Sequence, residues 1–311
     1  MNLKESEILI KNLEAEKVKI EDTTSSYYGE LDAQIKRIKK EAYSNLSAWD
    51  RVCLARKSDR PKSEDYIELL FEGFYELHGD RGVKDDKSLI GGVAYFEGMP
   101  VTILAQAKGK DLQSNIERNF GMMNPEGYRK ALRLAKQAEK FKRPIINIVD
   151  TSGAFPGKEA EERGQAEAIA NCLFTFSNLE VPIISIVIGE GGSGGALALS
   201  VADRLVMLEN SIYSILSPEG FASILWKDDT RVREAADIMK LTAYDLLDKK
   251  VIDDVIKEPL GGAGECIEYV AENMKNYILR ELNILKKMDM KTLLDERYQK
   301  TRSIGKMLYE K

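Results

Sequence analysis

The sequence has few of the side chains on which metal sites and disulfide frameworks depend. Among 311 residues there are only three cysteines and one histidine. Cys53, Cys172 and Cys266 lie far apart and form no CxxC pair, so we expect neither a metal site nor a disulfide framework in this chain. An odd number of cysteines also fits a reducing compartment, and we expect the protein to be cytoplasmic.

A basic surface and a continuous apolar run are also missing. The net charge is −5 and no stripe of lysine and arginine alternates with aromatic residues, which argues against a role in nucleic-acid binding. The N-terminus lacks the apolar core of a secretory signal. The most apolar stretch, 181–202, has a single charge, but Pro182 and five glycines interrupt it, so we expect no membrane span.

What the chain does contain is enough apolar residues for a sizeable core, at 43% of the composition. Leu, Ile, Glu and Lys recur at helical spacing near both ends. The patterns predict three regions, which are a helical N-terminal arm (1–60), a core (61–262) and C-terminal helices (263–311). Beyond the arm, the helices that they predict are 66–75, 160–174, 196–202, 266–286 and 290–308.

The core contains an imperfect repeat. Three apolar strands follow Pro100, Pro144 and Pro182, and the last two prolines are 38 residues apart. A glycine-bearing turn and a helix follow each of these two strands. Repeating strand, strand, helix units of this kind indicate an α/β fold of stacked modules, with parallel strands inside and helices outside.

The stretch from Gly189 to Gly195 has five glycines in seven positions, between a predicted strand and a predicted helix. Glycine permits positive φ and close approach of a ligand, and the first amides of a helix have no internal acceptor. We therefore expect N–H groups here that can bind something negative. The turn from Asp150 to Gly157 has the same place in the preceding unit, so we expect both turns at the ligand-binding end of the sheet.

Several chemistries are compatible with these glycines. The pattern GxGxxG from Gly189 to Gly194, with Glu209 twenty residues after its first glycine, predicts a dinucleotide-binding oxidoreductase as the alternative function. A GxSxG pattern surrounds Ser193, but a hydrolase would need His78 as its base, and His78 precedes the serine. A scaffold whose glycine turns only pack is a further possibility. Backbone amides that stabilise an oxyanion need glycine and no acid or base in this chain, and we favour that chemistry.

Longer motifs point to a family. They are GDR (79–81), RNFGM (118–122), PEGYRKA (125–131), DTSGAFPG (150–157), EERGQ (161–165), GEGGSGGALA (189–198), SPEG (217–220) and EPLGG (258–262). Together they resemble the carboxyltransferase α subunits of bacterial acetyl-CoA carboxylases, and the resemblance covers nearly the whole chain.

The resemblance implies a crotonase-like (ClpP/crotonase) fold of stacked ββα units with helical N- and C-terminal extensions. It implies transfer of a carboxyl group from carboxybiotin, on the biotin carboxyl carrier protein, to acetyl-CoA, giving malonyl-CoA in the first committed step of fatty acid biosynthesis. A β subunit is the implied partner in an α2β2 heterotetramer. That subunit is expected to carry the zinc and to hold the acetyl-CoA enolate.

The resemblance also implies site residues. Gly194 and Gly195 would form a backbone oxyanion hole for the ureido oxygen of biotin. The residues expected to bind biotin or to support these two are Gly191, Gly192, Gly153, Phe155, Pro156 and Gly157. A side chain at Gly195 is expected to enter the space of the charged oxygen and to leave the fold intact.

Overall fold

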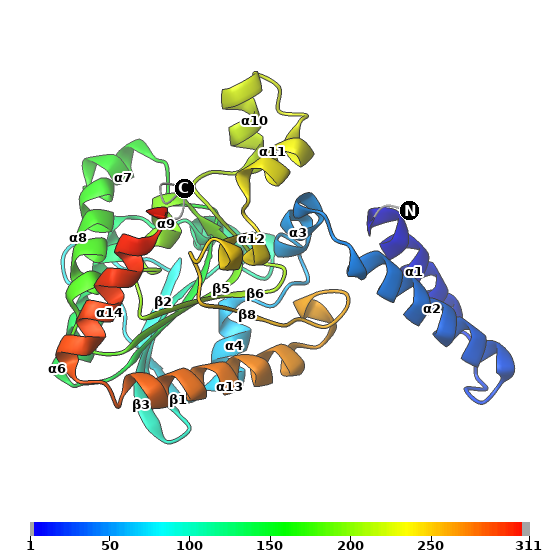
Figure 1. The fold of residues 1–311 in the computed structure, drawn as a ribbon, viewed down its shortest axis with the longest axis horizontal. Helices are drawn as coiled ribbons and strands as arrows, with labels where there is room; N and C mark the ends of the chain where they lie inside the picture. The colour runs from blue at the N-terminus through cyan, green and yellow to red at the C-terminus, as the bar shows by residue number, and fades with distance from the viewer. Residues whose placement is uncertain (1–2, 307–311) are drawn as a thin grey trace.

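A mixed eight-stranded sheet lies at the centre of the computed structural model, which describes residues 3–306 (Figure 1). The strand order is β1-β2-β3-β4-β5-β6-β8, and β7 pairs with β5. The strands are β1 (Glu72–Glu76), β2 (Leu89–Phe96), β3 (Met99–Gln106), β4 (Ile145–Thr151), β5 (Ile183–Gly192), β6 (Arg204–Leu208), β7 (Ile212–Ser214) and β8 (Asp254–Ile256).

The helices surround this sheet. They are α1 (Leu3–Lys17), α2 (Ser26–Ser44), α3 (Ala48–Ala55), α4 (Ser63–Leu70), α5 (Leu112–Glu117), α6 (Pro125–Lys140), α7 (Lys158–Glu162), α8 (Gln165–Asn178), α9 (Ser193–Leu197), α10 (Pro218–Trp226), α11 (Val232–Met239), α12 (Ala243–Asp248), α13 (Ile267–Leu285) and α14 (Met290–Ser303), with 3-10 turns η1 (Asn119–Gly121) and η2 (Ala263–Glu265). None of the helices in residues 3–306 combines the length and the apolar character that crossing a membrane requires.

The sheet changes from antiparallel to parallel at β3. β2 and β3 are antiparallel, and the two residues that join them, Glu97 and Gly98, have φ of 47° and 74°. Positive φ at both positions is typical of a type I′ turn, whose twist matches that of the two strands. From β3 onward β4, β5, β6 and β8 are parallel, as predicted, whereas β1, β2 and β3 form an antiparallel edge.

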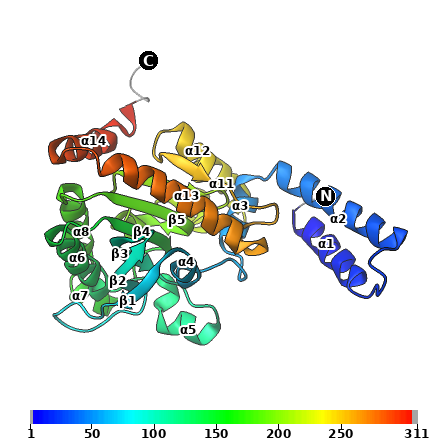
Figure 2. The same ribbon diagram turned by 90° about the horizontal axis from the view of Figure 1, so that it is seen from below.

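The central strands are buried on both faces. Ile184 and Ile186 of β5 lie in a core with α4 and α13, and Ile183 and Val187 lie in a second core with α6 and α8. Successive side chains of a strand point to opposite faces, so a strand between two helical layers needs a continuous apolar run. Figure 2 shows α13 lying across the strands.

The α1–α2 hairpin projects from one side of the sheet (Figure 1) and has a small apolar core of its own. Ion pairs join this hairpin to the rest of the chain. The Lys39 ammonium lies 2.8 Å from the Glu265 carboxylate, and Lys57 lies 3.0 Å from Glu7. The hairpin is therefore attached mainly through polar contacts at one end.

Some predicted helix bounds were wrong. The helix predicted over 66–75 ends at Leu70, because the following residues are extended and pair with β2 as β1. The helix predicted over 160–174 is two helices, since Gly164 interrupts it with φ of 82°. The helix predicted over 196–202 begins earlier, at Ser193, and ends at Leu197. The end of the helix predicted over 290–308 lies outside the described residues, and α14 ends at Ser303.

A buried arginine attaches the last helix. The Arg297 side chain is 1% exposed and pairs with Asp203 through two bonds, Nε to Oδ1 at 2.8 Å and Nη2 to Oδ2 at 2.9 Å. It also donates to the carbonyls of Phe176, Leu179 and Val181. A two-bond arginine–carboxylate pair is the strongest geometry for such contacts, and here it fixes α14 to the end of α8.

We predict that Arg297→Met lowers the free energy of unfolding by about 3–5 kcal/mol, because it leaves the Asp203 carboxylate buried without its cation. Urea denaturation measures the change. Arg302→Met is the matched control, since Arg302 is exposed on the same helix and its replacement should cost less than about 0.5 kcal/mol. Equal effects of the two substitutions would contradict the prediction.

Candidate active site

The glycine stretch spans the junction between β5 and α9. Gly189, Gly191 and Gly192 are still extended, and the chain turns into α9 at Ser193, which has φ of 54°. Positive φ is uncommon for residues other than glycine and is concentrated at functional sites. The N-terminus of α9 therefore follows the strand without a loop.

The turn after β4 packs directly against this junction. A Cβ atom added to Gly192 would lie 2.1 Å from the Ser152 carbonyl oxygen, and one added to Gly195 would lie 2.5 Å from the Ala154 nitrogen. No side chain fits at such distances from a backbone. The two turns lie together at one end of the sheet, as predicted, and glycine is what allows their backbones to touch.

Gly195 therefore has a different environment from the one predicted. A side chain there would meet the backbone of Gly153 and Ala154, so it would disturb the packing of the two turns before it reached any ligand. Gly194 is different, because a Cβ added to it would meet only the Ile169 side chain, at 3.8 Å. The prediction that a side chain at Gly195 would leave the fold intact was wrong, and Gly194 is the position that tolerates one.

Gly194, at the start of α9, lines a cavity, whereas Gly195 is buried and is not among the lining residues. Gly194 and Gly195 occupy the first turn of α9, and their N–H groups donate to no group within residues 3–306. Gly194 is one of the residues that line a cavity of about 650 Å³. The others are Ser193, Leu197, Tyr213, Ser214, Ile215, Leu216, Phe221, Met239, Lys240, Leu246 and Val251. Its walls are mainly apolar, so a negative group bound there would rely on the amides.

Not every predicted site residue reaches this cavity. Gly191 packs against the Tyr213 ring and Gly192 against Ser152, so both serve the close packing of the junction. Phe155 and Gly157 contact each other in the first turn, since a Cβ on Gly157 would lie 2.4 Å from the Phe155 ring. Neither these two nor Pro156 lines the cavity, and their contact with biotin stays a prediction.

A cluster of charged side chains, buried to different degrees, includes Glu190 of the glycine stretch. The Lys108 ammonium is 2.8 Å from Glu190 and 3.0 Å from Asp150. Arg56 contacts Glu190 and Glu219, both at 2.7 Å. Arg56 thereby connects α10, one wall of the cavity, to β5.

Lys108 and Glu190, the pair at the centre of this cluster, both stay ionised. Burial opposes the charge on Lys108, but Asp150 and Glu190 outweigh it and raise the pKa of the ammonium. Burial likewise opposes the charge on Glu190, but Lys108 and Arg56 outweigh it and lower the pKa of the carboxyl. Sequence reasoning missed this cluster. Glu190 is the one charge in the stretch 181–202, and that isolation could have predicted a buried partner.

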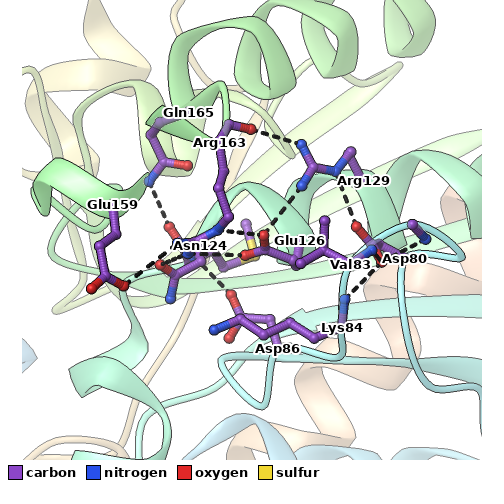
Figure 3. Close-up of polar contacts among 12 residues, drawn as sticks. Asp80, Val83, Lys84, Asp86, Asn124, Glu126, Arg129, Glu159, Arg163 and Gln165 are labelled. Carbon is purple, nitrogen blue, oxygen red and sulfur yellow. Dashed lines mark hydrogen bonds and ion pairs between the residues drawn. The ribbon is translucent and has the colours of Figure 1, made fainter. Parts of the chain in front are cut away.

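A second network centres on Glu126 of α6 (Figure 3). The fully buried Glu126 carboxylate accepts from Arg163 Nε at 2.7 Å and from Arg129 Nη2 at 3.2 Å. Gln165 Nε2 donates to the Phe155 carbonyl at 3.0 Å and to the Met123 carbonyl at 2.8 Å. These contacts bring together three of the motifs noted in the sequence and attach the first turn to α6 and α8.

The residues that the dinucleotide and hydrolase alternatives require, Glu209 and His78, are engaged by other side chains. Glu209, the acid expected to bind a ribose, accepts hydrogen bonds from Tyr244 Oη, Lys257 Nζ and the Glu258 amide, so its oxygens are engaged within the chain. His78 pairs with Asp85, Nδ1 to Oδ2 at 3.0 Å, and is not among the residues around the cavity that Ser193 lines. Within residues 3–306 no group of three or more His, Cys, Asp or Glu side chains could hold a metal ion.

Comparison with known proteins identifies the family. A family model described as acetyl co-enzyme A carboxylase carboxyltransferase-like matches residues 2–305. The chain belongs to this family. The acetyl-coenzyme A carboxylase carboxyl transferase subunit alpha of Alkaliphilus oremlandii is 58% identical over 275 residues, which are 88% of this chain and 87% of that relative. A family relative from Natranaerobius thermophilus, named as subunits beta/alpha, is 57% identical over 289 residues, 91% of this chain and 48% of that relative.

Solved structures confirm the predicted fold. A transcarboxylase 12S structure with methylmalonyl-coenzyme A and methylmalonic acid bound matches with a TM-score of 0.60 at 20% identity. The match covers 74% of this chain, which spans only 42% of the transcarboxylase chain. The predicted crotonase-like architecture is thus shown for this family member, and the family decides against the dinucleotide alternative.

We predict that Lys108→Met lowers the free energy of unfolding by about 3 kcal/mol near neutral pH, because Asp150 and Glu190 lose their shared cation. In the wild type the folded-state pKa of Glu190 lies below its unfolded value, so its contribution is present above that value and is lost as the pH falls. The substitution raises that folded-state pKa. The difference in the free energy of unfolding between wild type and Lys108→Met should therefore grow from about pH 4 to about pH 7.

Urea denaturation across this pH range measures the difference. Lys87→Met is the control, because Lys87 pairs with Glu117 at the surface. A difference between wild type and Lys108→Met that does not change with pH would contradict the charge argument.

Proposed function

We propose that this chain is the α half of a biotin-dependent carboxyltransferase. It would move a carboxyl group from carboxybiotin, held on a biotin carboxyl carrier protein, to acetyl-CoA and so form malonyl-CoA. The single observation that supports this most is the pair of unengaged amides at the start of α9, of which Gly194 lines an apolar cavity.

The chemistry asks for an anion site. Carboxybiotin supplies the carboxyl group, and its departure leaves negative charge on the ureido oxygen. The Gly194 and Gly195 N–H groups would donate to that oxygen, and the positive end of α9 would add to the attraction. The apolar walls from Leu197, Ile215 and Phe221 would exclude water and strengthen these hydrogen bonds.

The rest of the reaction would come from partners. The Natranaerobius relative, in which beta and alpha are one protein, supports a β subunit as the partner of this chain. We propose that the β subunit binds acetyl-CoA and carries the zinc, that the two form an α2β2 heterotetramer, and that the assembly works in the cytoplasm. The three cysteines of this chain are free, which is compatible with a reducing compartment.

The division into an arm (1–60), a carboxyltransferase core (61–262) and C-terminal helices (263–311) belongs to the same proposal. On this division the core alone would carry the glycines of the site. The first-turn residues Gly153, Phe155, Pro156 and Gly157 would support the biotin pocket from the side of β4.

We predict that Gly194→Val lowers kcat for carboxyl transfer about 100-fold, because the branched side chain hinders approach to the amides. The fold should survive, since the added Cβ has only Ile169 within 4 Å. The assay is malonyl-CoA formation by the chain together with its β subunit, with the thermal midpoint recorded in parallel. The β subunit should be required for activity.

Gly194→Ala is the matched control. It adds one methyl group at an ordinary contact distance and should retain most of the activity. Full activity of Gly194→Val, or full activity of the isolated chain, would contradict the proposal.

A further inference from the structure

Gln106 is a buried amide that the reaction outlined above does not use. It is the last residue of β3, it is 0% exposed, and its backbone oxygen accepts a hydrogen bond from Ser63 Oγ at 2.5 Å. A buried side-chain amide is expected to be hydrogen-bonded, because removing it from water costs free energy unless a partner replaces the water. The position of that partner indicates what Gln106 does.

The partner is the carbonyl of Gly195. Gln106 Nε2 donates to the Gly195 oxygen at 2.7 Å and so joins the end of β3 to α9. The acceptor fixes the orientation of the amide, since only its nitrogen can donate to a carbonyl. Gln106 Oε1 is buried and has no partner in residues 3–306, so the side chain makes this one bond to the site and no competing one.

The backbone of α9 leaves this carbonyl open. The Ala198 N–H donates to the Gly194 oxygen and the Leu199 N–H to the Ala196 oxygen, each at 3.1 Å. No backbone N–H of the described residues therefore donates to the Gly195 carbonyl. In the part of the chain that the structure describes, Gln106 is the donor that replaces the missing backbone bond.

Gly195 is held from two sides as a result. The backbone of Gly153 and Ala154 lies against its Cα, at distances that admit no side chain. The Gln106 amide holds its carbonyl from β3. A peptide unit is planar, so fixing this carbonyl fixes the plane of the Gly195–Ala196 peptide and, with the packing, the direction of the first turn of α9.

We propose that Gln106 is a positioning residue for carboxyl transfer. It holds the Gly195–Ala196 peptide, and through it the first turn of α9, so that Gly194 keeps its place at the cavity. This inference rests on the proposed function, because the amides matter only if they receive the developing charge. A donor misplaced by about 1 Å can cost about 100-fold in rate.

The test is the steady-state kinetics of Gln106→Met in the complex with the β subunit. Methionine has a similar length and no donor. We expect kcat to fall about 10- to 100-fold, while KM for acetyl-CoA changes less than about twofold, because an interaction that acts in the transition state lowers kcat and leaves KM. Gln106→Asn is the second variant. It keeps an amide in the core but withdraws it by about 1.5 Å, and it should show the same loss of kcat.

Asn147→Leu is the matched control. Asn147 is also a fully buried amide, and its Nδ2 donates to the Leu199 carbonyl at 2.9 Å, beyond the C-terminal end of α9. We expect this variant to lose stability and to keep kcat within about threefold. Equal losses of kcat in Asn147→Leu and Gln106→Met would show a general effect of core damage and overturn the inference.

The Gly194→Val variant separates this inference from the proposed function. If Gly194→Val is inactive and both Gln106 variants are fully active, the inference fails and the function stands. If Gly194→Val is fully active, the amides do not carry the reaction, and the role of Gln106 fails with them. Loss of kcat at both positions with unchanged KM supports both statements.

Discussion

The site depends on direct contact between two backbones. The turn after β4 and the junction of β5 with α9 approach so closely at Gly192 and Gly195 that no side chain can stand between them. This contact brings the end of one parallel strand unit against the start of the next. The helix N-terminus is thereby held by close packing of main chain against main chain.

Ion pairs and hydrogen bonds around this contact support it. Lys108 follows β3, Asp150 lies near the end of β4 and Glu190 lies in β5, so one ion cluster connects three neighbouring strands beside the glycines. Gln165 of α8 donates to the Phe155 carbonyl in the first turn, and the Glu126–Arg163 pair joins α6 to the chain just before α8 (Figure 3). A pocket that must present bare amides needs such support, because the amides themselves form no bond that would fix them.

The sequence predicted the parts of the fold that depend on local patterns. The apolar runs after Pro144 and Pro182 became β4 and β5, and the glycines marked where β5 meets a helix. The bounds of α9 could not be predicted, because glycine is a poor helix former and Gly195 packs against a turn about forty residues earlier in the chain. Gln106 was missed for a similar reason. Its partner is 89 residues away, and a polar residue at a strand end carries no local sign of what it contacts.

The attachment of α14 by Arg297 determines how late in synthesis folding can finish. Arg297 pairs with the carboxylate of Asp203 and donates to the carbonyl of Phe176. It is translated 94 residues after Asp203 and 121 residues after Phe176. Until Arg297 leaves the ribosome, the Asp203 carboxylate and the carbonyls of Phe176, Leu179 and Val181 lack this partner. The docking of α14 must therefore wait until almost all of these 311 residues have been synthesised.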